Sequence, residues 1–227
     1  VYEMNYCIEF FAEKAAINPA NIYKKLNEVS QTPLSCFCRF GDKYLISASP
    51  ERFLKKTGNK IISQPIKGTA KRGITSEEDE KIKSDLRNNS KEQSENVMIV
   101  DLVRNDLSRS AKSDSVNVDE LFGVYTFKQV HQMISTVSAE LKGEIHLIDA
   151  IKNTFPMGSM TGAPKVKAMQ LIEKHESTKR GLYSGAVGYI APDGDFDFNV
   201  VIRSILYNAS EQYVSFMVGS AITDKSE

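Results

Sequence analysis

The stretch SENVMIVDLVRNDLSRSA, residues 94–111, fits the 3.6-residue repeat of a helix better than the alternation of a strand. Glu95, Met98, Ile99 and Leu102 fall on one face of that helix. The sequence therefore predicts a long amphipathic helix whose apolar stripe faces a core and carries a carboxylate.

Strand patterns dominate the chain on both sides of this helix. Before it, alternating or β-branched runs cover residues 2–11, 34–40, 43–48, 52–56 and 59–66, with one short helix at 19–29. After it come strand patterns at 124–141, 181–190, 196–208 and 212–222, and helices near 146–154 and from Pro164 onward. Ser76 followed by Asp79 resembles a helix capping box. The patterns predict a chain that mixes helices with strands, the strands of the first third being mostly antiparallel.

Composition excludes some classes of partner. The 227 residues are 41% hydrophobic and 26% charged, enough for one sizeable core. Basic and acidic side chains balance at 29 each, which gives no electrostatic reason to expect nucleic acid or an anionic membrane surface as a partner. Any anionic ligand must therefore be bound by a local cluster of charges.

The cysteines and the apolar runs predict a cytoplasmic protein. Cys7, Cys36 and Cys38 are odd in number and lack CxxC spacing, which favours a reducing compartment. No apolar run approaches the ~20 residues that a membrane-spanning helix needs. The chain begins within a strand pattern without Met and stops after another, so we expect it to be part of a longer protein.

Two charged residues lie in apolar surroundings and need partners. Glu95, on the core-facing stripe, either binds a hard cation such as Mg²⁺ or pairs with an arginine such as Arg52 or Arg104. Arg203, within NVVIRSI, is predicted in a central strand, where its guanidinium is either paired internally or presented to a ligand carboxylate. The residues alone leave both choices open.

Lys67 stands in the stretch QPIKGTAKRG, residues 64–73, where a strand meets a glycine turn. Taken alone, a lysine in such a place is usually a solvated surface residue. Whether Lys67 takes part in a reaction therefore has to be judged from the rest of the sequence.

Six motifs together resemble the chorismate-utilising enzymes, and they occur in that family's order and spacing over nearly the whole chain. The motifs are SPERF (49–53), PIKGT (65–69), ENVMIVDLVRNDL (95–107), FPMGSMTGAPKVKAM (155–169), YSGAVGY (183–189) and VIRS (201–204). The family includes anthranilate synthase component I, isochorismate and salicylate synthases, and aminodeoxychorismate synthase component I. The resemblance implies an α/β fold of the α+β type, with two stacked, mainly antiparallel sheets and outer helices. It also implies one chorismate-binding catalytic domain over residues 1–227, without the family's N-terminal region and final C-terminal helix.

Within the family, the residue between Ile66 and Gly68 separates the activities. Anthranilate and isochorismate synthases typically carry Ala there, whereas aminodeoxychorismate synthases carry Lys, as this chain does at Lys67. The resemblance is therefore closest to aminodeoxychorismate synthase component I, which aminates chorismate at C4 on the route to p-aminobenzoate and folate. It implies that the Lys67 amine, once uncharged, attacks C2 of the ring and expels the C4 hydroxyl, after which ammonia enters at C4.

The same resemblance implies roles for the other motif residues. Glu51 would be the general acid that protonates the departing hydroxyl. Glu95 would hold Mg²⁺ against the ring carboxylate. The substrate-binding residues implied are Asn5, Thr69, Ser159, Tyr183, Arg203 and Gly219. Tyr183, Arg203 and the amides near Gly219 would bind the enolpyruvyl carboxylate. Ammonia would come from a separate glutamine amidotransferase subunit.

Four positions bear on how far the resemblance extends. Asn5 falls where isochorismate synthases place a water-activating lysine, and an amide cannot serve as that base. Gln132, or His131 if the alignment slips by one, falls where anthranilate synthases have His. Ala221 ends a Gly219-Ser220-Ala221 tripeptide that is usually richer in glycine. The family's second metal-binding glutamate is expected beyond Glu227.

Two alternatives to chorismate amination stay open at this point. The nearer one is another chorismate activity, anthranilate or isochorismate synthesis. The other is a non-catalytic domain that binds chorismate without turnover.

Overall fold

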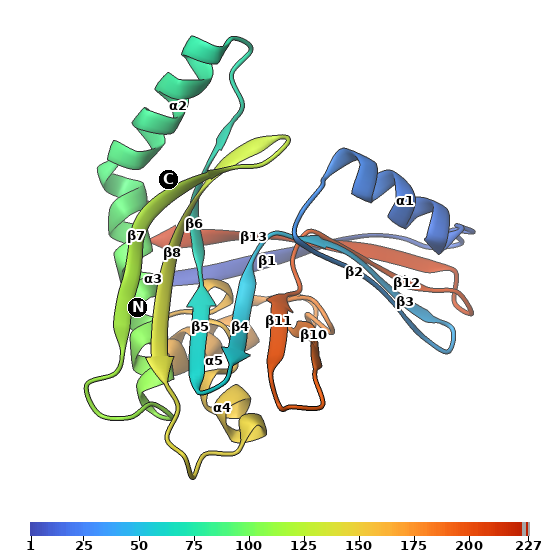
Figure 1. The fold of residues 1–227 in the computed structure, drawn as a ribbon. Coiled ribbons are helices and arrows are strands. Elements are labelled where there is room, and N and C mark those ends of the chain that lie inside the picture. The colour runs from blue at the N-terminus through green and yellow to red at the C-terminus, as the bar shows by residue number, and fades with distance from the viewer. Residues whose placement is uncertain (224–225, 227) are drawn as a thin grey trace.

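The computed structural model describes residues 1–223 and 226, which form two antiparallel sheets with helices at their margins (Figure 1). Sheet A has the order β2 (Leu34–Phe40), β3 (Lys43–Ser49), β12 (Ser204–Asn208), β13 (Tyr213–Thr223), β1 (Glu3–Ala12) and β9 (Gly162–Ala163). Sheet B has the order β10 (Ala186–Ile190), β11 (Phe196–Val200), β4 (Arg52–Thr57), β5 (Lys60–Gln64), β8 (Val130–Glu140) and β6 (Ile66–Lys71), with β7 (Asn117–Thr126) paired to β8. The predicted fold class is confirmed.

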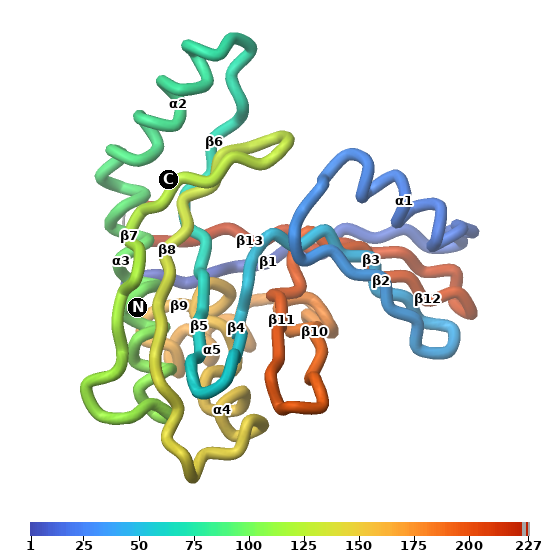
Figure 2. Tube along the Cα trace, viewed as in Figure 1, coloured from blue at the N-terminus to red at the C-terminus, as the bar shows by residue number. Residues whose placement is uncertain are grey.

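The helices lie around these sheets. They are α1 (Pro19–Val29), α2 (Ser76–Asn88), α3 (Ser90–Ser108), α4 (Leu147–Thr154) and α5 (Lys165–His175), with a 3₁₀ turn, η1 (Gly158–Met160). Helix α1 contacts β2 and β3, α3 contacts β6, β7 and β8, and α5 contacts β1 and β9. The tube in Figure 2 shows β1 and β13 running side by side, which the register confirms by placing Glu3 opposite Thr223.

Helix α3 forms as predicted, although it begins earlier than the quoted stretch. The Asn89 side chain caps it by accepting hydrogen bonds from the backbone N–H groups of Lys91 (3.0 Å) and Glu92 (3.1 Å). The fully buried face consists of Asn96, Ile99, Val100, Val103, Asp106 and Leu107. Of the predicted stripe only Ile99 is fully buried, whereas Glu95, Met98 and Leu102 are half-buried, so the Glu95 carboxylate lies at the edge of the core rather than inside it.

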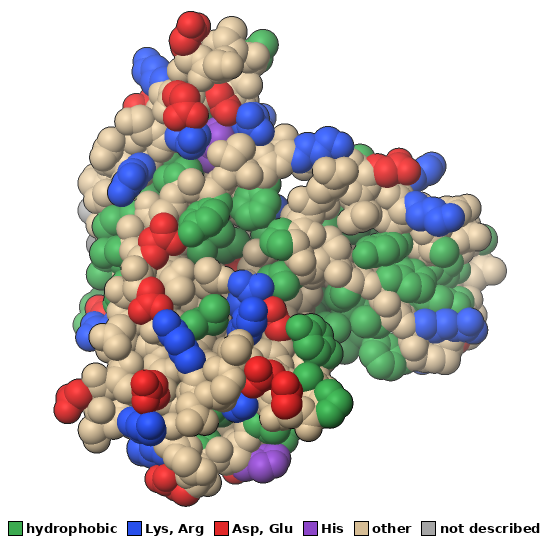
Figure 3. Space-filling model, in the orientation of Figure 1, with side chains coloured by type: hydrophobic (Ala, Val, Ile, Leu, Met, Phe, Trp, Pro, Cys, Tyr) green, Lys and Arg blue, Asp and Glu red, His purple; other side chains and the backbone are tan. Residues whose placement is uncertain are grey.

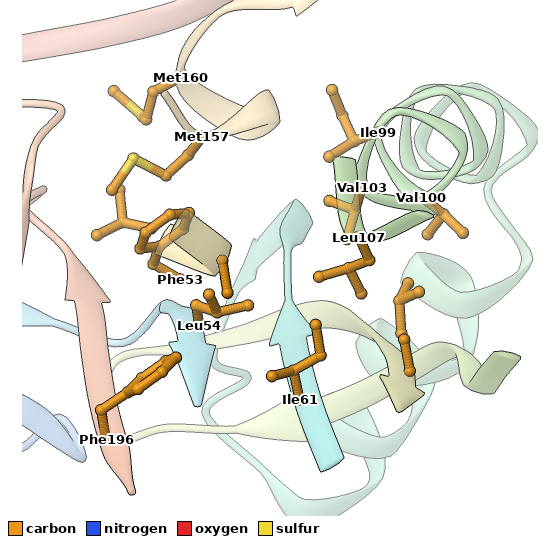
Figure 4. Packing of buried hydrophobic residues seen from close by; sticks show 14 of the residues in the cluster. Phe53, Leu54, Ile61, Ile99, Val100, Val103, Leu107, Met157, Met160 and Phe196 are labelled. Atoms are coloured by element: carbon orange, nitrogen blue, oxygen red, sulfur yellow. The ribbon is translucent and has the colours of Figure 1, made fainter. Parts of the chain in front are cut away.

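The core is packed between α3 and sheet B. Figure 4 shows Ile99, Val103 and Leu107 of α3 on one side and Leu54 and Ile61 of sheet B close by. The same cluster includes Phe53, Phe196, Met157 and Met160. Burying such side chains stabilises the fold by about 1.5–3 kcal/mol each.

One predicted strand is wrong, and the break that replaces it helps to position the site. Residues 196–208 were expected to form a single strand, but the structure divides them into β11 in sheet B and β12 in sheet A. Arg203 lies in the break with φ +50, a conformation rare for a non-glycine residue. Its carbonyl accepts a hydrogen bond from Ala48 N (3.1 Å) as the chain enters sheet A. Arg203 is therefore in a crossover between sheets, not in a central strand.

Other boundaries also shift. Pro65 separates β5 from β6 within the run predicted at 59–66, because proline has no N–H for the ladder. The run at 124–141 is a hairpin of β7 and β8 rather than one strand. The N-cap of α2 is Thr75, whose side chain accepts from Glu78 N at 3.2 Å, one residue before the predicted position. Pro164 is the N-cap of α5.

Surface charge follows the balanced composition. On the face drawn in Figure 3, basic and acidic side chains are interspersed rather than gathered by sign. Among the described residues, no helix is long and apolar enough to cross a membrane.

Candidate active site

A cavity of about 910 Å³ lies between the two sheets. Its walls come from β6 and α3 on one side and from β1 and β13 of sheet A on the other. All the residues predicted for the site line it, namely Asn5, Glu51, Lys67, Thr69, Glu95, Ser159, Tyr183, Arg203 and Gly219. The structure thus brings together residues from both ends of the chain, while their chemical roles stay predictions.

Glu51 occupies the crossover from β3 to β4. Its carbonyl accepts a hydrogen bond from Val200 N (3.0 Å), which ties this crossover to the end of β11. Its side chain is buried and accepts a hydrogen bond from Ser159 Oγ (2.5 Å). Burial raises the pKa of Glu51 to about 7, and the Ser159 hydrogen bond and the charge of Lys67 oppose that rise. A carboxyl group in this state can donate a proton near neutral pH.

Lys67 is not a solvated lysine. Its side chain is 10% exposed and forms an ion pair with Glu3, itself buried. Gly68 follows with φ +98, and a Cβ there would approach both Glu92 Oε2 and Met133 Cβ to 3.2 Å. Glycine therefore lets β6 lie close to α3 while the lysine side chain faces the cavity.

Two carboxylates of α3 line the cavity one helical turn apart. Glu92 and Glu95 are half-buried, and the pKa of Glu92 is raised by burial and by the charge of Glu95. The arginine pairing considered for Glu95 is wrong, because Arg52 pairs with Asp197 (2.9 Å) and Arg104 with Asp101 (2.9 Å).

These two carboxylates fit a Mg²⁺ ion. Mg²⁺ commonly takes one or two protein carboxylates and completes its shell with water and substrate oxygens. A cation there would relieve the repulsion between Glu92 and Glu95. Within residues 1–223 and 226, no cluster of three or more His, Cys, Asp or Glu side chains could enclose a metal, so any ion here would need oxygens from outside that set.

The opposite wall suits an anion. Burial lowers the pKa of Arg203, Glu51 partly offsets this, and no carboxylate of the described residues forms an ion pair with it. Burial raises the pKa of Tyr183, which keeps its phenol protonated. Gly219 leaves room beside them, because a Cβ there would approach Asn5 Oδ1 to 2.6 Å. A guanidinium with no ion pair among the described residues, beside a phenol that contacts the Gly219 backbone, is suited to bind a carboxylate.

Alternation along β8 decides which residue faces the cavity at the Gln132 position. Gln132 lines the cavity, and its side chain lies 3.5 Å from Thr69 Oγ1. His131 points to the other side of the sheet, where its Nε2 bonds Asp79 (2.8 Å) and its Nδ1 bonds Thr126 (3.0 Å). The cavity therefore presents an amide, not an imidazole, at this point.

A family model described as chorismate binding enzyme matches residues 1–227. The chain belongs to this family. Among curated proteins, aminodeoxychorismate synthase from Streptomyces griseus is 41% identical over 97% of this chain and 31% of its own length. Aminodeoxychorismate synthase component 1 from Bacillus subtilis (strain 168) is 38% identical over 98% and 47%. Anthranilate synthase component 1 from Aquifex aeolicus (strain VF5) is also 38% identical, over 92% and 42%.

A solved structure from the same group of enzymes is also similar to this chain. Anthranilate synthase component I from Streptococcus pneumoniae TIGR4 superposes with a TM-score of 0.89 and 33% identity, covering 100% of this chain and 49% of that one. The chain thus spans less than half the length of each of these relatives.

Three residues that matter to the cavity were not predicted. Glu3 lies two residues before Asn5, so strand alternation places both on the buried face, and this signal was available. Glu92 lies three residues before Glu95 on the same helix. Arg180 donates hydrogen bonds to the carbonyls of Asn5 (2.9 Å) and Met160 (2.6 Å), a long-range role with no local signal.

Proposed function

We propose that the chain is the chorismate-aminating part of an aminodeoxychorismate synthase, which replaces the C4 hydroxyl of chorismate with an amino group. The observation that carries this proposal is the Lys67 amine, which lines the cavity together with the buried carboxyl of Glu51. The relatives named aminodeoxychorismate synthase support it, while overall identity alone does not, since an anthranilate synthase component is as similar as one of them.

The two groups divide the chemistry between them. The uncharged Lys67 amine bonds to C2, the C1=C2 double bond moves to C1=C6, the C5=C6 double bond moves to C4=C5, and the C4–O bond breaks. Glu51, whose pKa of about 7 leaves it substantially protonated at neutral pH, gives its proton to the departing hydroxyl, which leaves as water. Ammonia then bonds to C4, the C2–N bond breaks, and Lys67 is released as an amine.

The rest of the cavity would hold the substrate in place. Arg203 and Tyr183, with the backbone amides near Gly219, bind the enolpyruvyl carboxylate. Glu95, with Glu92, would hold Mg²⁺, which supplies positive charge for the ring carboxylate when it is bound. Thr69 and Ser159 lie beside the ring.

A relative's name supports the presence of a second subunit. The Bacillus subtilis relative is named component 1, which implies a second component. We propose that a glutamine amidotransferase subunit supplies ammonia to this chain, and that the product serves p-aminobenzoate and folate synthesis.

Product analysis tests the proposal against its rivals. The full-length protein is incubated with chorismate, Mg²⁺ and an ammonium salt, and the products are separated and identified. We expect 4-amino-4-deoxychorismate. Anthranilate or isochorismate as the main product would refute the proposal in favour of the sister activities, and chorismate binding without any turnover would favour a non-catalytic domain.

A further inference from the structure

Glu3 is a buried acidic residue whose only described side-chain partner is the amine of Lys67. Its side chain is 1% exposed, and one carboxylate oxygen, Oε1, contacts Lys67 Nζ. The other oxygen, Oε2, is buried with no hydrogen-bond partner among the described residues. Glu3 does not line the cavity, so it reaches the substrate space only through Lys67.

The fold fixes Glu3 firmly in this place. Strand β1 is paired on both sides at this residue, with Thr223 of β13 opposite Glu3 on one side and Ala163 of β9 on the other. Glu3, Asn5 and Cys7 form the buried face of the strand. Gly162 has no room for a Cβ, which would meet the Glu3 carbonyl oxygen at 2.2 Å. The carboxylate therefore has little freedom to move away from the amine.

A carboxylate buried this deeply needs a positive charge or a proton. Burying an ionised group is costly unless it is paired, and an ion pair in a poorly hydrated place can exchange one proton to become an acid and an amine. Because Oε2 has no hydrogen-bond partner among the described residues, the contact of Oε1 with Lys67 is the one described interaction that compensates the burial of this side chain. Lys67 must lose a proton before it can attack, and Glu3 is in contact with it.

The other acidic groups around Lys67 are engaged elsewhere. Glu51 lies near enough to interact with the Lys67 charge, but its carboxyl accepts from Ser159 and holds the proton meant for the leaving hydroxyl. Glu92 also interacts with Lys67, but its nearest charges include Glu95 and Lys91 on its own helix. Of the three, Glu3 alone forms an ion pair with Lys67.

We propose that Glu3 positions Lys67 and holds its proton during the covalent stage of the reaction. This inference rests on the proposed function. The proton passes from the Lys67 ammonium to the Glu3 carboxylate, leaving an uncharged amine that bonds to C2 while Glu51 protonates the departing hydroxyl. When ammonia bonds to C4 and the C2–N bond breaks, the released amine takes its proton back from Glu3. The new C4 ammonium returns a proton to Glu51, so the cycle consumes chorismate and ammonia and releases aminodeoxychorismate and water.

Two substitutions at Glu3 test this in the full-length protein. Glu3→Gln keeps the shape of the side chain but cannot accept the proton, and we expect kcat for amination to fall about a hundredfold or more. The KM for chorismate should change less than about threefold, because Glu3 does not line the cavity. Glu9→Gln is the matched control, since Glu9 is on the same strand, bonded to Tyr213 rather than to the site, and should behave as wild type.

Glu3→Asp covers the case in which the glutamine variant does not fold. It keeps the negative charge but withdraws the carboxylate by one methylene, so kcat should fall about tenfold with KM unchanged. If the wild-type protein aminates chorismate and whichever Glu3 variant folds keeps the wild-type kcat, the role proposed for Glu3 is overturned while the proposed function stands. A loss that falls on KM instead of kcat would also overturn that role. A wild-type protein that does not aminate chorismate would overturn the proposed function, and this inference with it.

Discussion

At the scale of single residues, two ionisable groups that line the cavity, Glu51 and Lys67, have different partners. Burial of Glu51 favours its protonated form and outweighs the Ser159 hydrogen bond and the nearby positive charges, which oppose it. Lys67 is given a carboxylate, Glu3, with which to share its proton. One group is thus prepared to donate a proton and the other to give one up before attack, a division typical of acid–base pairs in active sites.

Removing the Lys67 amine tests whether the reaction is covalent. In Lys67→Ala, only direct attack by ammonia remains, so kcat for amination should fall about a hundredfold or more. Lys71→Ala is the control, because Lys71 is exposed on the same strand, β6. Steady-state rates with chorismate and ammonium salt make the comparison. Amination at the wild-type rate in Lys67→Ala would remove this residue from the mechanism.

The pKa of Glu51 predicts how the rate depends on pH. Burial raises this pKa above its ordinary value of 4.5 to about 7, so the acid form is present below pH 7 and is lost as pH rises through that value. With free ammonia held constant, kcat/KM should fall about tenfold per unit above pH 7. The Ser159 hydrogen bond stabilises the ionised carboxylate, so Ser159→Ala should raise the pKa of Glu51 further. The fall in kcat/KM, which is the basic limb of the pH profile, should then begin at a higher pH.

Ser220→Ala provides the control for the shifted limb. Ser220 also lines the cavity but has no hydrogen bond to Glu51. Its removal should leave the position of the limb unchanged, whatever it does to the rate. A limb that stays in place in Ser159→Ala would mean that another group sets it.

At the scale of elements, the sequence predicts the bounds of those helices and strands that neighbouring residues determine. The bounds of α1 (19–29) and β2 (34–40) agree with their patterns, because a Pro near the helix start and an alternating run act within a few residues. The break between β11 and β12 carries no such signal, since residues 200–202 are Val, Val and Ile, which suit a strand throughout. Two different sheets pair with the two halves, and pairing of this kind depends on residues far away in the chain.

The site residues also divide into those that a local sequence pattern predicts and those that it does not. Seven of the nine predicted residues belong to local motifs and two, Asn5 and Gly219, to separate strand patterns, and all nine meet at the cavity. Glu3 and Arg180 act through partners 64 and 175 residues away, at Lys67 and Asn5. Such contacts exist only once β1 is paired into sheet A, so no local pattern reports them, although alternation from Asn5 already placed Glu3 on the buried face.

A buried ion pair fixes the position of the loop that carries Ser159. Asp106 of α3 and Lys165 of α5 lie 2.5 Å apart, and Lys165 Nζ also donates to the Pro156 carbonyl (2.7 Å). In Asp106→Asn the lysine keeps its charge in a buried place, so the free energy of unfolding should fall by about 3–5 kcal/mol. Denaturant unfolding measures this change.

Asp101→Asn supplies the matched comparison on the same helix. The Asp101 pair with Arg104 is exposed, and its loss should cost less than about 1 kcal/mol. Equal effects of the two substitutions would show that the Asp106 pair does not stabilise the fold beyond an ordinary surface pair.

At the scale of the whole molecule, the cavity exists because the chain crosses between sheets at two adjacent places. The crossover at Glu51 leads from sheet A to sheet B, and the one at Arg203 leads back. The hydrogen bond from Val200 N to the Glu51 carbonyl joins them. A ligand held by Arg203 at this junction and by the Lys67 side of sheet B would connect the sheets to each other.

Chorismate should therefore stabilise the whole fold and not one sheet. At a concentration about 100 times its Kd, with Mg²⁺ present, a ligand that binds only the folded state adds about 2.7 kcal/mol. For a domain of this size we expect the thermal midpoint to rise by about 5–10 °C in a single transition. At the same ligand concentration, Arg203→Ala should lose most of that rise because the carboxylate loses its charged partner, whereas Arg39→Ala, on β2 away from the cavity, should keep it. An equal rise in Arg203→Ala would place the ligand's carboxylate elsewhere, and a rise in only one of two separate transitions would show that the sheets unfold independently.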